Sequence, residues 1–337
     1  MNKFKLLIFV IFTVNQSCTT QANKVNGVSF VASGEAINDK NITPLVKLNA
    51  NYAAIMPFGY IKSLEYPQIA FNTERQWFGE SKAGVKQYIQ ELNKKNIKIM
   101  LKPQIWVWHG EFTGYIEMKN ETDWTILENS YSKFILEYAK LAQDIKADMF
   151  CVGTELEKFI TNRPSYWVQL ISKIKTVYKG KLTYAANWDE FKRTPLWEDL
   201  DYIGIDAYFP VNDSKTPTLN ACLAGWKTHK LVISEISKKY NKPVLFTEFG
   251  YRSVDYSGKE PWKSDRSMNQ VNLEAQTNTT KALFETFWKE DWFAGGFVWK
   301  WFHNYEASGG HNNSRFTPQN KPVETVIRQY YSKKWTK

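Results

Sequence analysis

The feature that most constrains the fold of this chain is an alternation of short apolar, strand-like runs with segments of helical spacing. Eight such runs occur, at residues 28–31, 52–57, 97–103, 149–153, 182–186, 202–207, 244–247 and 296–299. Strands that alternate with helices form a parallel sheet. Eight of them in a chain of 337 residues predict an α/β protein with a single (β/α)8 TIM barrel. A doubly wound open sheet is the alternative, but no Gly-rich phosphate loop follows any run.

Between the runs lie segments with apolar residues at helical spacing. The clearest covers residues 81–95, where Val85, Tyr88, Ile89 and Leu92 fall on one face. The others are residues 130–145, 166–178, 223–240, 269–289 and 323–331, and the connection at 190–200 has only a weak helical pattern. The aromatic-rich residues 59–79, 106–129 and 252–267 are expected to be long loops. Loops that follow barrel strands build the active site, so these should shape a groove.

Two of the runs lead into a glutamate, Glu155 after the fourth and Glu248 after the seventh. A carboxylate at the end of a buried strand is costly to leave unpaired. Two of them at one face of a barrel can flank a glycosidic bond, one as proton donor and one as nucleophile. Burial and mutual repulsion separate their pKa values and so give each its role. The alternative is that either glutamate pairs with a nearby cation such as Lys158 or Arg252.

Other polar and aromatic residues at the run ends are expected to bind substrate. Tyr208 is placed to donate a hydrogen bond to Glu248 and keep it ionised. Trp299 is expected to form the floor under the reacting sugar, and period-two alternation puts Trp301 on the same face. Core packing is the alternative for these aromatic residues. The full expected set is Lys102, Trp106, His109, Thr154, Asn187, Trp188, Asp206, Tyr208, Trp299 and Trp301.

Glu157 competes with Glu155, because strand alternation would point both to the same side. Glu157 is expected instead to begin the next helix, where the helix N-terminus favours a carboxylate. It is therefore assigned a structural or substrate-binding role.

Composition favours a groove for flat ligands and speaks against nucleic acid. The chain has 14 Trp, many of them near the predicted strand ends, and such rings stack on flat apolar faces. The net charge is +10, but the lysines cluster at predicted helix ends, so no nucleic-acid partner is expected. The four histidines lie apart without a metal-ligand spacing, so no metal and no other cofactor is expected. Cys151 and Cys222 are expected to be buried thiols, with a disulfide as the alternative.

The N-terminus has the pattern of a targeting segment. Two lysines precede the apolar residues 6–14, a stretch too short to cross a bilayer. Cys18 follows a small residue, as in a bacterial lipobox, although residues 15 and 16 depart from the usual pattern. The expected organisation is a signal peptide at 1–17, a lipidated Cys18 that begins a polar tether at 18–24, and a catalytic barrel at 25–337. The protein would then be exported and lipid-anchored in the bacterial cell envelope, periplasmic or at the cell surface, with ordinary cleavage as the alternative.

Four segments together resemble glycoside hydrolase family 113, the β-mannanases of a retaining clan whose acid/base and nucleophile follow strands four and seven. They begin at Lys102, Gly153, Phe246 and Trp299 and read KPQIW, GTELE, FTEFGY and WKW, within a resemblance over about 25–335. The resemblance implies that Glu155 is the acid/base and Glu248 the nucleophile. Much of the wider clan has Asn where this chain has Thr154, a difference compatible with the axial 2-hydroxyl of mannose.

The resulting hypothesis is a monomeric, lipid-anchored, retaining endo-β-1,4-mannanase whose partner is β-mannan or a related polysaccharide or oligosaccharide. Within enzymes, the alternative is a β-glycanase that acts on another β-linked glucan. From a different class, the chain could be a non-catalytic carbohydrate-binding lipoprotein. The presence of both glutamates argues against that last alternative.

Overall fold

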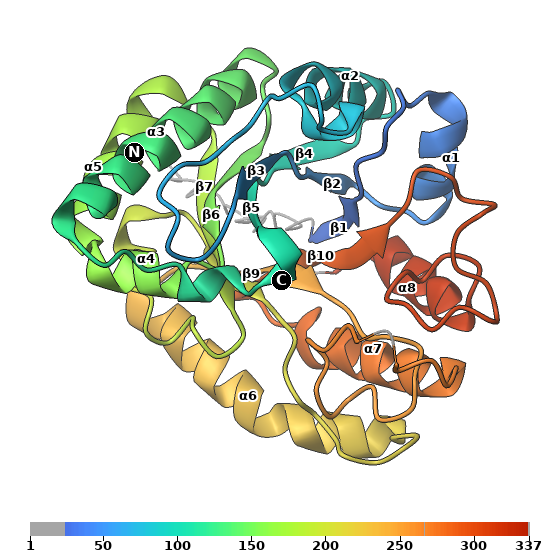
Figure 1. Cartoon of the computed structure of the whole chain (residues 1–337). Helices are drawn as coiled ribbons and strands as arrows, with labels where there is room; N and C mark the ends of the chain where they lie inside the picture. Colours follow the sequence, from blue (N-terminus) through green and yellow to red (C-terminus); the bar gives the residue numbers. More distant parts are fainter. Residues whose placement is uncertain (1–23, 266, 336–337) are drawn as a thin grey trace, which may run out of the picture.

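The computed structural model describes residues 24–265 and 267–335. Within them, eight parallel strands close into a barrel, and helices surround it (Figure 1). The barrel strands are β1 (Val25–Phe30), β2 (Tyr52–Ile55), β4 (Lys98–Leu101), β6 (Met149–Thr154), β7 (Lys181–Asn187), β8 (Ile203–Asp206), β9 (Val244–Phe249) and β10 (Phe293–Trp301). β1 pairs with both β2 and β10, which closes the ring. Each strand overlaps one predicted run, so the predicted (β/α)8 barrel is confirmed.

The outer helices lie where helical spacing predicted them, with two additions. The described helices are α1 (Asp39–Lys47), α2 (Lys82–Asn93), α3 (Glu121–Asp144), α4 (Glu157–Asn162), α5 (Pro164–Val177), α6 (Leu219–Tyr240), α7 (Leu273–Phe287) and α8 (Pro322–Ser332). α1 was not predicted, and of the short α4 only its start at Glu157 was expected. α1 contains Pro44 and is stabilised by the Asn38 side chain, which accepts from Lys40 N. The connection at 190–200 has one short 3-10 turn at Trp197–Asp199, in line with its weak pattern.

Two layers of apolar side chains hold the barrel together. Inside it, six strands each contribute one residue to a small cluster: Val25, Ala54, Met100, Met149, Leu245 and Phe297. The alternate strand positions face outward and join the helices in the main core. At Gly27 on β1, a Cβ atom would lie 2.4 Å from the ring of Phe297, so this position needs glycine to admit the ring.

The expected loops differ in two places. β3 (Phe58–Ile61) and β5 (Gln104–Val107) form a separate two-stranded parallel sheet, where loops were expected from residues 59 and 106. α3 begins at Glu121, nine residues before the predicted start at 130, because Asn120 accepts a hydrogen bond from Asp123 N (2.9 Å) and caps it. The sequence carries this cap signal, an Asn followed by acidic residues in the first turn.

The predicted signal peptide, Cys18 and all of the tether except Lys24 lie outside the described residues. Among the described helices, none is long and apolar enough to cross a membrane. Cys151 and Cys222 are both buried and carry free thiols.

Candidate active site

Glu248 lies on β9 and its carboxylate is held by three donors from two segments of the chain. Lys102 Nζ donates to Oε1 at 2.5 Å, and Gln104 Nε2 donates to the same oxygen at 3.0 Å. Tyr208 donates its hydroxyl to Oε2 at 2.7 Å, the contact that the sequence predicted. Charge-assisted hydrogen bonds of this kind fix the orientation of a carboxylate and favour its ionised form. Glu248 therefore has the surroundings of a nucleophile.

Lys102 also binds Asp206, at the end of β8, and the two form a buried ion pair. Lys102 Nζ lies 3.1 Å from Asp206 Oδ1, which also accepts from the Thr247 hydroxyl at 2.7 Å. Burial alone would lower the pKa of Lys102, but Asp206 and Glu248 raise it above its ordinary value, so it stays a cation. Burial and Glu248 raise the pKa of Asp206 to about 7, against the opposing effect of Lys102.

The burial of this pair corrects one expectation. From the sequence, Lys102 and Asp206 were expected to bind substrate. Lys102 is 0% exposed and Asp206 is 1% exposed, so neither can contact a sugar in the cavity. Lys102 instead binds Glu248, and Asp206 binds Lys102, so the pair helps to fix the position of Glu248.

Glu155 follows β6 and has the opposite surroundings. Its side chain is partly exposed, and its carboxyl accepts no hydrogen bond from any described residue. Burial raises its pKa well above the ordinary value, and Asp206 and Glu248 raise it further. A carboxyl with a raised pKa keeps its proton to higher pH than an ordinary carboxyl and can donate it. Glu155 is therefore suited to be the general acid.

The backbone at Glu155 turns sharply out of the strand. Its φ of +50° lies in the left-handed region, which is uncommon for a residue other than glycine. Glu155 N donates to Ala185 O on the neighbouring strand β7, at 2.8 Å. Strained backbone of this kind is frequent at functional sites.

Neither cation named as an alternative partner pairs with Glu155 or Glu248, although Glu248 does pair with another lysine, Lys102. Lys158 binds Glu117 at 2.6 Å, and Arg252 donates to three backbone carbonyls. Glu157 begins α4, as expected, and pairs with Arg193 at 2.5 Å. It does not line the cavity that Glu155 faces.

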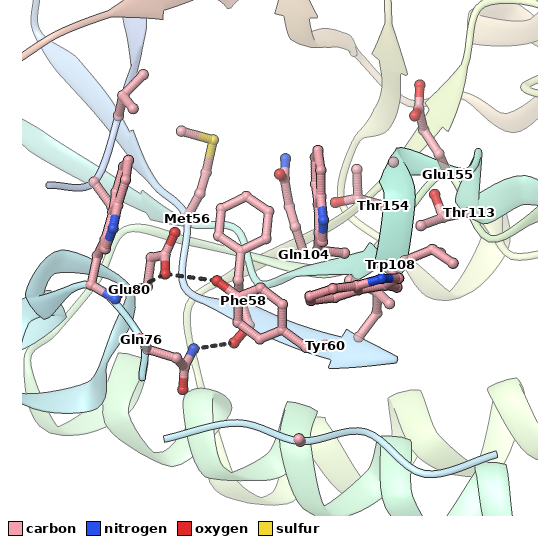
Figure 2. A pocket seen from close by; sticks show the side chains of 18 of the residues that line it. Met56, Phe58, Tyr60, Gln76, Glu80, Gln104, Trp108, Thr113, Thr154 and Glu155 are labelled. Atoms are coloured by element: carbon pink, nitrogen blue, oxygen red, sulfur yellow. Dashed lines mark hydrogen bonds between the residues drawn. The ribbon is translucent and has the colours of Figure 1, made fainter. Parts of the chain in front are cut away.

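A cavity of about 1200 Å³ lies at this end of the barrel, and both Glu155 and Glu248 line it. Phe58, Tyr60 and Gln104, from the small β3–β5 sheet, form part of its wall (Figure 2). Figure 2 shows the two hydrogen bonds that fix this wall, from Tyr60 to Glu80 at 2.7 Å and from Gln76 to the Phe58 carbonyl at 2.8 Å.

Exposed indole rings extend the cavity beyond the glutamates. Trp77, Trp106 and Trp108 all line it and are each about half exposed or more. Trp299 and Thr154 line it as well, in agreement with their expected positions. Large rings with free faces are suited to pack on the C–H faces of sugars.

Trp301 is a further correction. It is fully buried and stacks on Tyr305, with ring centroids 5.8 Å apart, so it does not reach the cavity. The pairing of β10 with β1 shifts register between Val298 and Trp301, and the assumed period-two alternation therefore fails there.

Three other expected residues lie outside the cavity. His109 is exposed in a turn with φ of +64° and contacts the ring of Trp108. Asn187 accepts from Trp188 N at 2.9 Å, and Trp188 stacks on Trp262 with centroids 5.0 Å apart. Contacts of these three residues with substrate stay predictions.

Several polar residues of the cavity were not in the expected set, among them Gln104 and Lys300. Gln104 donates to Glu248, and the signals for it were its place just after a strand-like run and within the KPQIW segment. Lys300 lines the cavity, and no described acidic residue lies in ion-pair contact with it; its Nζ lies 5.1 Å from the ring centre of Trp299. Burial lowers the pKa of Lys300, and Arg315 adds to this, while Glu248 opposes it.

The described residues include no cluster of three or more His, Cys, Asp or Glu side chains that could hold a metal ion. A closed (β/α)8 barrel with a carboxyl of raised pKa and a donor-held carboxylate on one cavity has the features of a glycoside hydrolase. The chain belongs to Glycoside Hydrolase Family 113, whose model matches residues 32–321. This confirms the resemblance found in the sequence.

Solved structures agree with this assignment at the level of the fold. One is the GH113 β-mannanase AaManA from Alicyclobacillus acidocaldarius in complex with ManMIm, with a TM-score of 0.80 and 23% identity over 92% of this chain and 97% of that chain. A second GH113 β-1,4-mannanase has a TM-score of 0.80 and 21% identity over 92% of this chain and all of the other. A β-glucuronidase from Faecalibacterium prausnitzii reaches 0.61 at 14% identity, over 93% of this chain and 49% of that one. No curated protein matches the chain.

Proposed function

We propose that this enzyme is a retaining endo-β-1,4-mannanase that hydrolyses mannan or glucomannan. The observation that carries the proposal is the contrast between the two glutamates of one cavity. Glu248 is held by Lys102, Gln104 and Tyr208, while the carboxyl of Glu155 is without a described partner and has a raised pKa. Mannan as substrate is supported by the printed descriptions of the most similar solved structures, which are β-mannanases.

The reaction would proceed by double displacement. Glu248 attacks the anomeric carbon while Glu155 gives its proton to the leaving glycosidic oxygen, and a glycosyl ester of Glu248 results. Glu155, now ionised, takes a proton from water, which attacks the anomeric carbon and releases Glu248. This mechanism requires carboxyl groups about 5–5.5 Å apart, whereas inversion requires roughly 6.5–9.5 Å. NMR of the first anomer released tests it, and early release of the opposite anomer would rule out retention.

Endo action is supported by aromatic side chains that lie near the ends of several different barrel strands. The indoles of Trp77, Trp106 and Trp108 line the cavity from the side of β3 and β5. The stacked pair Trp188–Trp262 comes from the segments after β7 and β9. Aromatic surfaces in loops on different sides of the barrel mouth suit a long chain that runs through the site. Endo cleavage should release a ladder of oligosaccharides from polymer at early times, and release of a single short product would contradict it.

Substrate choice is tested by a screen of purified enzyme on mannan, glucomannan, xylan and mixed-linkage glucan. Highest kcat/KM on mannan or glucomannan is expected. A preference for glucan or xylan would identify another β-glycanase. Lack of hydrolysis, with binding retained, would support the carbohydrate-binding alternative.

The roles of the two glutamates are separable by leaving group. Glu248→Ala should abolish hydrolysis of polymer and of activated aryl glycosides alike. Glu155→Ala should impair polymer most, because a good leaving group needs little acid assistance, and azide should accept the trapped glycosyl group. If Glu157→Ala shows the azide pattern instead, the acid has been misassigned.

We also propose that the enzyme is exported and lipid-anchored through Cys18. The support is the sequence pattern of residues 1–18. Cys18→Ser should release active enzyme into the soluble fraction, since stable attachment requires acyl chains. Mass spectrometry that finds an unmodified thiol at Cys18 would contradict the anchor.

A further inference from the structure

A buried tyrosine and a buried glutamate, both behind the cavity wall, lie against the turn that carries Glu155. We infer that Tyr184 is a positioning residue for the proton donor and that Glu190 orients its hydroxyl. The inference rests on the proposed role of Glu155 as the general acid. Neither residue lines the cavity, and each is at most 1% exposed.

The contacts form a short chain that starts at the turn. Leu156 N, the amide directly after Glu155, donates to the Tyr184 hydroxyl at 2.6 Å. The Tyr184 hydroxyl donates in turn to Glu190 Oε1 at 2.7 Å. Glu190 Oε2 accepts from Asn187 N at 3.0 Å, which holds Glu190 at the end of β7. The Tyr184 hydroxyl thus accepts one hydrogen bond and donates one.

The turn at Glu155 needs such support because its backbone is in an unfavourable conformation. With φ of +50°, Glu155 lies in the left-handed region that a residue with a Cβ rarely adopts. Two successive amides of the turn are tied to β7: Glu155 N to Ala185 O at 2.8 Å and Leu156 N to Tyr184. Loss of one tie would let the turn relax and move the carboxyl of Glu155 away from the leaving oxygen.

The network acts on the acid and not on the nucleophile. Glu248 takes its three donors from Lys102, Gln104 and Tyr208, and none of them contacts Tyr184 or Glu190 through a hydrogen bond. A defect in the network should therefore appear in proton donation. Proton donation matters for a poor leaving group and much less for a good one.

Tyr184→Phe is the central test because it removes only the hydroxyl. The ring contacts Trp167 and Trp197, each with centroids 6.2 Å away, and phenylalanine can keep them. We expect kcat on glucomannan to fall roughly 10- to 100-fold, while kcat on 2,4-dinitrophenyl β-mannobioside stays within about three-fold. Circular dichroism and a thermal melt confirm that the variant is folded.

Tyr178→Phe is the matched control. Tyr178 is also buried and donates to a backbone carbonyl, Ala147 O, at 2.7 Å, just before β6 begins. Tyr178→Phe should lower kcat on both substrates only slightly and by the same factor. At Glu190, Gln keeps an acceptor for the Tyr184 hydroxyl and should retain more polymer activity than Glu190→Ala.

Equal losses on both substrates in Tyr184→Phe would overturn the inference, because they would indicate a general structural role. No loss on either substrate would overturn it as well. The Glu155→Ala variant tests the proposed function separately. If that variant itself spares neither substrate, the acid role of Glu155 is wrong, whatever Tyr184 does.

Discussion

The ammonium group of Lys102 lies 2.5 Å from the carboxylate of Glu248, and the Lys102 side chain has no exposed surface. The same group binds Asp206, so a single buried cation is shared by two carboxylates. A buried charge is tolerated only when it is paired and hydrogen-bonded. Glu248, the proposed nucleophile, is thus part of the charge balance of the barrel interior as well as of the proposed chemistry.

Lys102→Met should therefore affect stability and activity together. Removing one partner of a buried ion pair leaves uncompensated charge, and we expect a loss of about 3–5 kcal/mol in the free energy of unfolding. Activity should fall on every substrate because Glu248 loses its cationic partner. Urea denaturation measures the first effect and aryl-glycoside kinetics the second.

Lys158→Met is the control for this prediction. Its pair with Glu117 has nearly the same N–O distance, 2.6 Å, but both side chains are exposed at the surface. Such a pair contributes about 1 kcal/mol or less. Equal destabilisation by the two substitutions would contradict the importance of burial at Lys102.

Tyr208→Phe should slow both polymer and activated aryl substrates by similar factors. The phenol donates to Glu248 Oε2 at 2.7 Å, so its loss weakens the orientation of the nucleophile, which both substrates need. A hydrogen bond to a charged group contributes about 1.5–3 kcal/mol, which corresponds to roughly 10- to 100-fold in kcat. Steady-state kinetics on both substrates measure this. A selective loss on polymer would place Tyr208 with the acid instead.

Activity on polymer should decline at alkaline pH as Glu155 loses its proton. Burial, Asp206 and Glu248 raise the pKa of Glu155, so it keeps its proton to higher pH than an ordinary carboxyl and stops being a donor once that proton is lost. Activated aryl glycosides need no proton and should keep their activity to higher pH. Profiles of kcat/KM against pH for both substrates test this, and coincident alkaline limbs would contradict it.

The elements that local patterns encode were predictable from the sequence. The eight strand runs and the two glutamates proposed as catalytic were recognised because an apolar run that ends in a carboxylate is visible locally. The Tyr208–Glu248 contact followed from the adjacency of strands six and seven in a barrel. These inferences need only chain order and closure of the ring.

The remainder depends on geometry that no local pattern contains. Lys102 and Asp206 looked like substrate ligands, but their side chains meet inside the barrel. Trp301 was misplaced because β10 shifts register against β1, which ends the alternation on which the prediction relied. The sequence did not predict the small β3–β5 sheet either, because its short strands are exposed on one side and have a mixed composition.

Stability should decrease as pH rises, and Glu190 should account for part of the decrease. Burial raises the pKa of Glu190 from 4.5 to about 8, so the folded protein holds a proton that the unfolded chain has lost. A raised folded pKa gives a contribution that is full below about pH 4.5 and is lost as pH rises through about 8. Glu190→Gln has no such proton to lose. The free energy of unfolding of Glu190→Gln, measured by urea denaturation at pH 5 to 9, should therefore fall less steeply with pH than that of the wild type. The difference between the two proteins should be a few kcal/mol at most. Asp206 titrates in the same direction with a pKa of about 7, but it is present in both proteins and cancels in the difference.

Glu117→Gln serves as the control, because the Lys158 pair lowers the pKa of Glu117, whose contribution is lost only in acid. Its curve should run parallel to the wild type over this range, and a Glu190→Gln curve that also runs parallel would show that Glu190 is ionised in the folded protein.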